Sequence, residues 1–544
     1  MPLKTTRIST RPFDDQRPGT SGLRKKVARF QADYYLENFV QAVFNAIPAN
    51  ERGLLVVGGD GRYFNQQATQ IIIRMATANG FKRVMVGADG ILSTPAVSNL
   101  IRVHGACGGI VLSASHNPGG PDEDFGIKFN NANGSPAPEA VTDAIYENTR
   151  TITEFFTTHG DDIDLTQPGE HVLGETRVEI VDSVTDYTET MQKCFDFNHL
   201  RDGFKSGRLS VCFDAMHAVT GPYARRILED ELGAVPASVI NARPLEDFGG
   251  GHPDPNLVHA HALVNRMAQA DAPSLGAASD GDGDRNLILG PGFFVTPSDS
   301  LAVLTAHARL IPQFADGLAG VARSMPTSTA VDRVARYLGV DCYETPTGWK
   351  FFGNLLDAGR INLCGEESFG TGGDHVREKD GLWTVLAWLT VVSRLNKSVK
   401  DVLDQHWNTY GRNFYCRHDF EAIPVDQADS MMDALRNGLI KLAGRQLGDF
   451  AVRSAGEFGY SDPVDGSRSE NQGVQVHFED GSRIVFRLSG TGTSGATLRM
   501  YVERYSTSGF GQDAISSNQP LAEAGREIID LTRFTGRDTA TVVT

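Results

Sequence analysis

A strand-then-helix pattern recurs three times along the chain and limits the possible folds more than any other feature. The first block opens with the continuous apolar run Gly53–Gly58, and a helical pattern follows over Gln66–Asn79. The strands of the second and third blocks are expected at Leu209–Phe213 and Leu318–Ser324. Strands without polar alternation are buried on both faces, which is typical of mostly parallel sheets covered by helices. The pattern predicts an α/β fold with three similar mixed α/β domains.

Each block also carries a glycine- or serine-rich loop directly after a strand. The three loops are Ser113–Gly120, Ser279–Arg285 and Gly365–Gly373. Ligands of open α/β sheets bind at the carboxyl ends of the strands. Three similar blocks would therefore offer three loops to one central cleft.

The last part of the chain has a different character. We expect strands over Val474–Phe478, Arg483–Leu488 and Thr497–Tyr505, and a closing helix near Leu521–Arg533. The first two strands are separated by a short segment suited to a hairpin turn. These signals predict a C-terminal α+β domain, preceded by a linker around Asn396–Asp404.

With 544 residues, the chain is long enough for several domains. We place the boundaries of four domains at 1–185, 186–298, 299–402 and 403–544. The first is expected to carry a serine loop, the second an aspartate loop, the third a glutamate loop and the fourth a phosphate-binding loop.

The net charge of −16 opposes a general nucleic-acid role, because phosphate backbones require a basic surface. It allows a small anionic substrate, which needs only a locally basic pocket. The N-terminus lacks the apolar core of a secretory signal. The apolar stretch Leu382–Leu395 has 14 residues, too few to cross a bilayer, and indicates a buried helix. We therefore expect a cytoplasmic protein that binds neither nucleic acid nor membrane.

The loop Ser113–Gly120 exposes one serine, Ser115, at the end of a predicted strand. Neighbouring backbone N–H groups could form an anion-binding nest around it. Taken alone, the same pattern also fits an ordinary turn with a capping serine.

The segment Asp280-Gly281-Asp282-Gly283-Asp284 places carboxylates at alternate positions. In an extended loop these side chains point to one side, and three like charges so close require a cation. Hard oxygen ligands select Mg²⁺ or Ca²⁺. An EF-hand is excluded, because its sixth and twelfth positions would be Arg285 and Pro291. A solvated acidic turn remains the alternative.

Two further loops carry weaker signals. The glutamates and serine of Gly365–Gly370 suit recognition of sugar hydroxyl groups, although a polar surface loop has the same composition. The loop Arg487–Gly495, followed by Arg499, contains GxGxxG. A dinucleotide fold requires a helix next, whereas Thr497–Val502 alternates as a strand does. A hydroxyl-rich loop with two arginines instead favours a dianion clamp.

Two further segments of the chain carry basic residues. Gly19–Lys26 combines small and hydroxyl residues with Arg24, and Gly126–Lys128 follows the serine loop. Each could equally be a solvated face of the protein.

Together these segments resemble the α-D-phosphohexomutase superfamily over nearly the whole chain. The matching stretches, in the family's order, are PGTSGLRKKV, SASHNPGG, GIKFN, DGDGDRN, TPTGWKFFGN, CGEESFGTGGDHVREKDGLW and RLSGTGTSGAT. TPTGWKFF and REKDGLW resemble the phosphoglucomutase branch. The resemblance implies four domains around a deep cleft. Departures are small: Ser113 stands where threonine is usual, and Thr493-Ser494 replaces a pair that is often Ser-Ala.

The resemblance also implies roles for individual residues. Ser115 resembles the phosphorylated serine and would add a phosphoryl oxygen to a Mg²⁺ site, one per subunit, formed by Asp280, Asp282 and Asp284. Arg24, Lys128, His116 and Lys379 would surround the transferring phosphoryl group. The expected substrate-binding residues are Thr20, Ser21, Arg285, Thr347, Gly348, Glu366, Ser368, Arg487, Ser489, Gly490, Thr491, Thr493 and Arg499.

The implied activity is an isomerase reaction of glucose metabolism, interconverting α-D-glucose 1-phosphate and D-glucose 6-phosphate through glucose 1,6-bisphosphate. We expect Lys128, near Arg24, to accept the hydroxyl proton, with His116 as the rival base. Other readings are a mutase for mannose or glucosamine phosphates, a phosphatase, and a non-catalytic structural adaptor of the same family. Sugar phosphates are the expected partners of a monomer or weak homo-oligomer.

Overall fold

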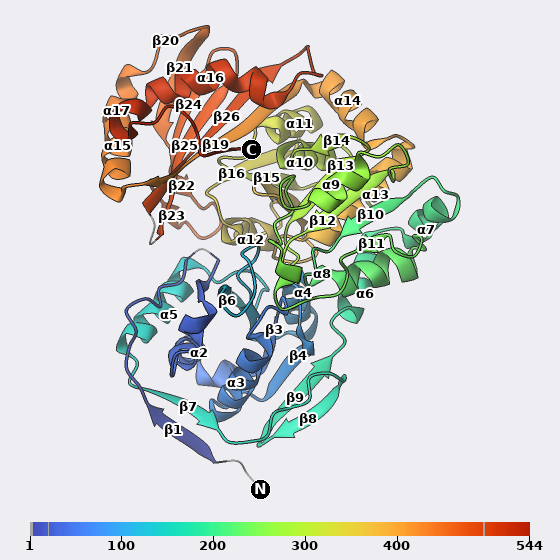
Figure 1. Ribbon diagram of the computed structural model, residues 1–544, viewed down its shortest axis with the longest axis vertical. Helices are drawn as coiled ribbons and strands as arrows, with labels where there is room; N and C mark the ends of the chain where they lie inside the picture. Colours follow the sequence, from blue (N-terminus) through green and yellow to red (C-terminus); the bar gives the residue numbers. More distant parts are fainter. Residues whose placement is uncertain (1–3, 20, 493–494) are drawn as a thin grey trace. The chain divides into compact units, whose positions relative to one another are not determined.

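The computed structural model describes residues 4–19, 21–492 and 495–544, and these form two compact units (Figure 1). The first unit comprises the chain up to Pro297 with His307–Ala319 and Gly348–Lys400. The second comprises Ser298–Ala306, Gly320–Thr347 and Asp401–Thr544. The predicted third domain, 299–402, thus contributes segments to both units.

The first unit contains a seven-stranded sheet in the order β2-β6-β5-β3-β4-β9-β8. Strand β3 (Leu54–Gly59) is buried throughout and pairs in parallel with β4 (Arg83–Ile91) and β5 (Gly108–Leu112). The β3 prediction is thereby confirmed within one residue at each end. The sheet is mixed, because the β5–β6, β2–β6 and β8–β9 pairs are antiparallel. The other strands are β2 (Leu23–Lys26), β6 (Asp124–Asn131), β8 (Gly169–Leu173) and β9 (Thr176–Val181).

Helices cover both faces of this sheet. The predicted helix after β3 is present as α3 (Asn65–Ala78), and it shares one apolar core with α2 (Tyr35–Asn45) and the sheet (Figure 1). The helix α4 (Thr94–His104) packs on β3 and β5, and its N-cap Ser93 accepts a hydrogen bond from Ala96 N at 3.2 Å. Further elements of this region are β1 (Thr5–Ser9), α1 (Val27–Phe30), α5 (Glu139–Thr151) and β7 (Glu154–Thr158).

The second sheet of the first unit has the order β11-β10-β12-β13-β14. Strand β10 (Val211–Asp214) pairs in parallel with its two neighbours, whereas the pairs of β13 (Asn286–Gly290) are antiparallel. The helix of the second block follows β10 as α8 (Thr220–Ala224), continued by the π-helix Arg225–Glu231. The remaining elements are α6 (Thr185–Cys194), α7 (Phe197–Lys205), β11 (Val239–Ile240), α9 (His261–Met267), β12 (Leu275–Ser279) and β14 (Phe293–Val295).

Four elements complete the first unit. They are α12 (Trp349–Asp357), the antiparallel pair β17 (Leu363–Glu366) and β18 (Gly370–Gly373), and α13 (Gly381–Leu395). The expected loop Gly365–Gly373 is wrong in extent: only residues 367–369 connect the strands, because the glycines of β18 pair with β17. The buried helix predicted over Leu382–Leu395 is confirmed as α13, which packs on β12 and β13.

No helix within the described ranges has both the length and the apolar character that crossing a bilayer requires.

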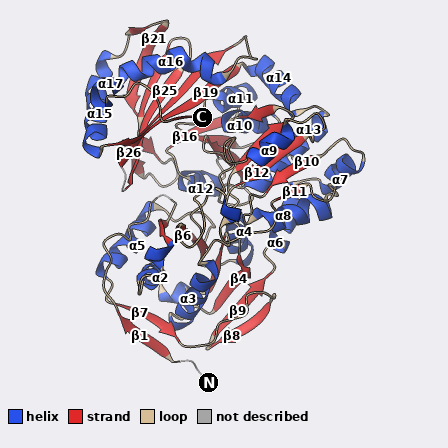
Figure 2. Ribbon diagram, viewed as in Figure 1, coloured by secondary structure: helices blue, strands red, loops and turns tan. Residues whose placement is uncertain are grey.

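The second unit contains a seven-stranded sheet whose strand pairs are all antiparallel, as expected for a domain of different character (Figure 2). Its order is β20-β21-β24-β25-β26-β19-β27. The helices α15 (Val425–Gly438), α16 (Ala514–Ile528) and α17 (Leu531–Thr535) share one core with it. The strands are β19 (Arg412–Ile423), β20 (Gln446–Leu447), β21 (Phe450–Glu457), β24 (Val474–Phe478), β25 (Arg483–Gly492), β26 (Gly495–Ser506) and β27 (Val542–Val543), and a separate pair is formed by β22 (Tyr460–Ser461) and β23 (Arg468–Ser469).

Two predictions near this sheet are right in place but not in detail. The chain passes from the first unit to the second after Lys400, within the predicted linker Asn396–Asp404, but this segment is the start of α14 (Val399–Tyr410), whose Val399, Val402 and Leu403 are buried. The closing helix begins at Ala514, and it is separated from α17 by Asp530, whose φ is +51°. The rest of the third block is present as α10 (Pro297–Ala306), β15 (Gly320–Ser324), α11 (Ala330–Leu338) and β16 (Asp341–Thr345), with β15 and β16 parallel.

A buried ion pair stabilises the second unit and gives a test of its packing. Arg483 Nη2 lies 2.9 Å from Glu503 Oε2, and the side chains are 2% and 1% exposed. Arg483→Met would leave Glu503 charged and buried, so we expect a loss of about 3–5 kcal/mol in unfolding free energy. Urea denaturation followed by circular dichroism measures the change. The exposed control Arg453→Met should alter stability by less than about 0.5 kcal/mol, and equal effects of the two variants would contradict the assignment.

Candidate active site

Ser115 lies in the turn that follows β5, with a backbone φ of +52°. Left-handed backbone at a non-glycine residue is strained and is found where surrounding structure enforces it, often at functional sites. The side chain is 4% exposed, and its Oγ donates a hydrogen bond to Asp280 Oδ2 at 2.9 Å. The structure therefore brings the predicted serine and the predicted aspartate loop into direct contact.

Ser113 and two residues that the sequence analysis missed, Asp60 and Arg62, hold this turn in place. Ser113 Oγ accepts a hydrogen bond from Ser115 N at 2.7 Å and donates one to Asp60 Oδ2 at 2.6 Å. Asp60 pairs with Arg62, both fully buried, and Arg62 Nη2 donates to Ser115 O at 2.8 Å. Asp60 and Arg62 directly follow the buried strand β3, and charged residues at that position were a signal that could have identified them.

The three aspartates converge as expected, but not by the expected conformation. Residues 280–284 form a tight turn rather than an extended loop: Gly283 N donates to Asp280 O at 3.2 Å, and Gly283 has a φ of +81°. Asp280 Oδ1 accepts hydrogen bonds from the N–H groups of Asp284 and Arg285, both at 3.0 Å. Thr94, at the start of α4, donates to Asp282 Oδ2 at 2.6 Å.

The donor set fits a hard divalent cation. Carboxylate oxygens of the three aspartates lie within 4.8 Å of one another, and all three residues are buried. Asp282 Oδ1 and Asp284 Oδ1 are buried and have no hydrogen-bond partner in the described part of the chain. Buried carboxylate oxygens without partners are costly unless a cation compensates them. The acidic triad can therefore hold a metal ion.

Electrostatics at the triad support the same reading. Burial and the carboxylates of Asp282 and Asp284 raise the pKa of Asp280 well above its ordinary value. Burial would also raise the pKa of Asp282, but the positive charge of Lys128 and the hydrogen bond from the Thr94 hydroxyl hold it at about 2, with help from Lys379 and Arg24. In the protein alone the three carboxyl groups therefore repel one another strongly enough that Asp280 favours its protonated form.

Several predicted basic residues surround the triad. Lys379 Nζ lies 2.8 Å from Asp284 Oδ2, and Arg285 Nε lies 3.8 Å from Asp280 Oδ2. Lys128 Nζ forms a 3.0 Å ion pair with Glu378, a 1% exposed residue that the sequence analysis did not select. Glu378 directly precedes the predicted Lys379 in a charged segment, and this position could have identified it from the sequence.

Arg24 and His116 also belong to this region. Arg24 lies on β2, and although burial lowers its pKa, Asp282 and Asp284 oppose that effect. His116 Nδ1 lies 3.3 Å from Ser115 Oγ. Burial, followed by the charges of Arg285 and Arg24, lowers the pKa of His116 to about 2, so the imidazole is neutral and weakly basic.

The residues expected to read sugar hydroxyl groups lie near α12 and the β17–β18 hairpin. Glu366 is 6% exposed and accepts a hydrogen bond from Gly348 N, the N-cap of α12, at 3.0 Å. Ser368 is half-buried at the hairpin tip. Thr347 belongs to the second unit, and its Oγ1 is buried with no hydrogen-bond partner among the described residues.

The expected phosphate clamp belongs to the second unit. Arg487 on β25 and Arg499 on β26 are directly opposite in the sheet, as are Ser489 and Thr497. Gly490 and Thr491 lie in β25 where its register shifts. Thr20 and Thr493 lie outside the described residues, and Ser21 is exposed. That the clamp and the serine loop face one cleft stays a prediction.

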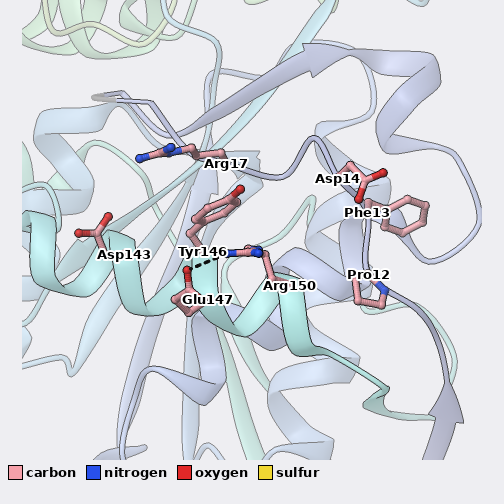
Figure 3. A pocket seen from close by; sticks show the side chains of 8 residues that line it. All are labelled: Pro12, Phe13, Asp14, Arg17, Asp143, Tyr146, Glu147 and Arg150. Atoms are coloured by element: carbon pink, nitrogen blue, oxygen red, sulfur yellow. Dashed lines mark hydrogen bonds and ion pairs between the residues drawn. The ribbon is translucent and has the colours of Figure 1, made fainter.

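A pocket away from these residues lies between the N-terminal segment and α5 (Figure 3). Its lining includes Arg17, Tyr146 and Arg150, and Arg150 forms an ion pair with Glu147 across one turn of α5. No predicted site residue lines it, so this pocket is separate from the predicted chemistry.

Comparison with known proteins decides the family. Models of the phosphoglucomutase/phosphomannomutase α/β/α domains I, II and III match residues 15–155, 185–291 and 297–410. The phosphoglucomutase-1 C-terminal domain matches residues 412–541. The chain belongs to the phosphoglucomutase branch of the α-D-phosphohexomutase superfamily. The four-domain α/β organisation inferred from the sequence is that of this family.

Individual relatives agree over the full length. The phosphoglucomutase of Rhizobium radiobacter is 54% identical over 539 residues, covering 99% of each chain. The cytoplasmic phosphoglucomutase of Populus tremula is 51% identical and covers 100% of each chain. Among solved structures, the exocytosis-sensitive phosphoprotein pp63/parafusin of Paramecium, a phosphoglucomutase, matches with a TM-score of 0.94, 48% identity and full coverage of both chains.

The contact between the serine and aspartate loops can be tested at Gly281. A Cβ added to Gly281 would lie 2.3 Å from Ser115 O, so Gly281→Ala forces the loops apart. We expect the affinity of the triad for a divalent cation, measured by calorimetry with Mg²⁺ as the probe, to fall about 10- to 100-fold, as when groups supporting a metal site are disturbed. The control Gly169→Ala places its Cβ where no atom lies within 4 Å and should bind Mg²⁺ as the parent protein does. Unchanged affinity in Gly281→Ala would show that the two loops are not tightly coupled.

Proposed function

We propose that this protein interconverts α-D-glucose 1-phosphate and D-glucose 6-phosphate by phosphoryl transfer to and from Ser115. The observation that carries the proposal is the 2.9 Å hydrogen bond from Ser115 Oγ to Asp280, one member of a buried acidic triad. A nucleophilic hydroxyl beside a divalent-cation site is the arrangement that phosphoryl transfer requires. Full-length relatives named phosphoglucomutase support the choice of substrate.

The cation that we propose is Mg²⁺, one per subunit, held by Asp280, Asp282 and Asp284. An all-oxygen donor set without nitrogen or sulfur favours Mg²⁺ over softer ions. When bound, it would neutralise charge on the phosphoryl group attached to Ser115. Three protein ligands leave room for a phosphoryl oxygen as a further ligand.

In the first half-reaction the bond between Ser115 Oγ and phosphorus breaks as a sugar hydroxyl oxygen forms a bond to the same phosphorus. In the second, Ser115 Oγ forms a bond to the other phosphorus of the bisphosphate as the bond from that phosphorus to the sugar oxygen breaks, and the sugar oxygen takes back a proton. Arg24, Lys379 and Arg285 supply positive charge around the equatorial oxygens. The hydroxyl proton passes to Lys128. Burial raises the pKa of Glu378. This favours the arrangement in which the proton of the Lys128–Glu378 hydrogen bond lies on the carboxyl, so that the uncharged amine can accept the hydroxyl proton.

His116 is the weaker candidate for the base. Its ring nitrogen lies 3.3 Å from Ser115 Oγ, but burial and two arginines hold its pKa at about 2. An imidazole with that pKa accepts a proton poorly at neutral pH. We assign it the task of orienting the Ser115 hydroxyl.

Glu366 and Ser368 would bind sugar hydroxyl groups, with Thr347 and Gly348 assisting the switch between two sugar orientations. Arg487, Ser489, Gly490, Thr491, Thr493 and Arg499 would bind the phosphate that is not being transferred. Glucose 1,6-bisphosphate is the proposed intermediate, which must turn over between half-reactions so that each phosphate in turn reaches Ser115.

We further propose the domain boundaries 1–185, 186–298, 299–402 and 403–544, a monomer or weak homo-oligomer, and a cytoplasmic location. The Populus tremula relative named cytoplasmic supports the location, although chloroplastic relatives from plants are also about 52% identical.

Ser115→Ala tests the central claim. The substitution removes the only proposed phosphoryl acceptor, so conversion of glucose 1-phosphate to glucose 6-phosphate should be lost in a coupled assay. Circular dichroism should show an intact fold. In the parent protein, intact mass should reveal one retained phosphoryl group that Ser115→Ala lacks. The control Ser113→Thr keeps the hydroxyl bonded to Asp60 and should remain active. Full activity of Ser115→Ala would remove the mechanism.

The assignment of the base is tested by a pair of variants. Lys128→Met should lower kcat by about 10²- to 10⁴-fold, the usual contribution of general acid–base catalysis. His116→Gln keeps a hydrogen-bonding group near Ser115 and should cost less than about tenfold. Steady-state kinetics across pH measures both. If His116→Gln lost the larger share of kcat, the roles of the two residues would be reversed.

A further inference from the structure

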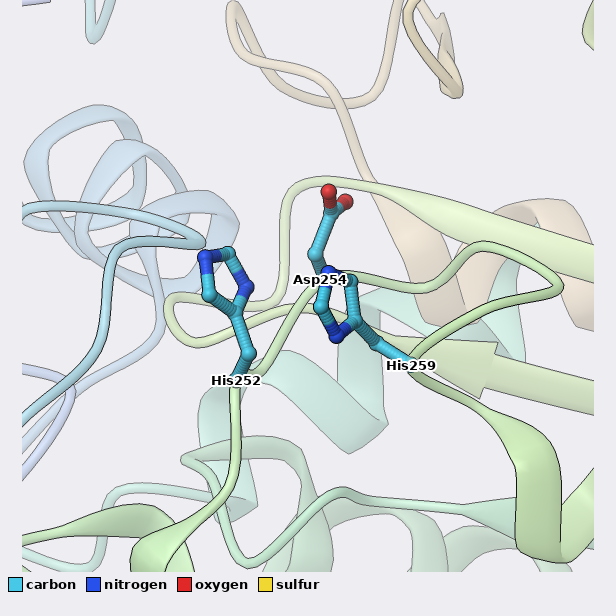
Figure 4. Close-up of side chains that lie close together, drawn as sticks. All are labelled: His252, Asp254 and His259. Atoms are coloured by element: carbon cyan, nitrogen blue, oxygen red, sulfur yellow. The ribbon is translucent and has the colours of Figure 1, made fainter. Parts of the chain in front are cut away.

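A second group of metal-ligand side chains lies outside the residues assigned above. His252, Asp254 and His259 come from one segment between the turn Phe248–Gly250 and α9. One ligand atom from each residue lies within 4.8 Å of the others, and all three side chains are half-buried. Figure 4 shows the His259 ring close to the Asp254 carboxylate, with His252 beside them.

The backbone of this segment is held in place without any ion. Asn256 Oδ1 accepts hydrogen bonds from the N–H groups of Val258 and His259, at 2.9 and 3.0 Å. Asn256 Nδ2 donates to Asp254 Oδ2 at 2.8 Å, which orients that carboxylate. Pro253 and Pro255 flank Asp254 and restrict its backbone further. A site built on restricted backbone binds metal at lower conformational cost.

The imidazoles are placed together, and one has a free nitrogen. The His252 and His259 rings stack with centroids 4.3 Å apart and an interplanar angle of 14°, so one ring must turn about its side-chain torsions before the in-plane lone pairs of both can reach one ion. His252 Nδ1 is buried and has no hydrogen-bond partner among the described residues. A buried ring nitrogen without a partner is unfavourable in the protein alone. A metal ion bound to the lone pair would remove that cost.

We propose that His252, Asp254 and His259 form a second cation site that binds a borderline divalent transition metal, with Zn²⁺ as the best match. Two imidazole nitrogens and one carboxylate are a common ligand set for Zn²⁺, whereas Mg²⁺ prefers oxygen alone. The two sites therefore differ in chemistry. This proposal is independent of the proposed function, because it concerns residues that have no part in the phosphoryl-transfer scheme.

The second site lies next to the acidic triad in the structure. Pro253 O accepts a hydrogen bond from Gly281 N at 3.2 Å, and Asp254 Oδ1 lies 4.0 Å from Arg285 Nη1. The His252 and His116 ring centroids are 6.2 Å apart. A cation on Asp254 would weaken the attraction between Asp254 and Arg285, so occupancy of this site is electrostatically linked to the triad.

The test is a Zn²⁺ titration of the full chain in excess Mg²⁺, which fills the oxygen site. A competing chromophoric chelator reports stoichiometry and affinity, and zinc X-ray absorption reports the ligand type. We expect one equivalent of Zn²⁺ with the multiple-scattering pattern of imidazole. His259→Phe keeps an aromatic ring at the position and should weaken this binding by more than about 100-fold, beyond the effect of losing a supporting contact.

Two further variants separate this site from its neighbours. His261→Phe changes an exposed histidine two positions away and should leave Zn²⁺ binding unchanged. Asp282→Asn disables the acidic triad and should also retain the imidazole-bound equivalent. The proposal is overturned if no Zn²⁺ binds in excess Mg²⁺, if His259→Phe binds it as the parent does, or if Asp282→Asn abolishes it. Thermal unfolding should show that each variant is folded.

Discussion

The convergence of Asp280, Asp282 and Asp284 in a buried turn is the constraint on which the catalytic region depends. Removing carboxylates from water is unfavourable, and their mutual repulsion adds to that cost. The protein compensates only in part: Lys379 pairs with Asp284, and two backbone N–H groups bond to Asp280. Two carboxylate oxygens keep no partner in the described structure. A bound cation would complete the compensation, and its binding free energy would then add to the free energy of unfolding.

Backbone geometry then joins the nucleophile to this charge. Ser115 adopts a left-handed conformation. It is held in place by Ser113, Asp60 and Arg62, and all three side chains are buried. Gly281 allows the aspartate turn to approach the Ser115 carbonyl more closely than any side chain would permit. The hydroxyl therefore meets Asp280 because two turns on different sheets can touch without an intervening Cβ.

The sequence predicted the features that depend on local pattern and missed those that depend on distant partners. Continuous apolar runs located β3 and β10, and the spacing of acidic residues located the triad. The turn at Gly283 was expected to be extended, because alternation alone does not report a positive φ. Glu378 was missed because its partner Lys128 lies 250 residues away. The predicted linker marks the passage between the two units but is helical, because Val399, Val402 and Leu403 are buried.

The sheet of the second unit shows the opposite electrostatic imbalance. Arg487 and Arg499 lie directly opposite on β25 and β26, where like charges destabilise a sheet. Arg487 Nε is bonded only weakly to Gln472 O at 3.3 Å, and Arg499 Nε is buried with no hydrogen-bond partner in the described ranges. Nearby Asp419 is paired with Arg417 and thus only partly offsets the two guanidinium groups. An anion with several oxygens would relieve this repulsion, as a cation would relieve that of the triad.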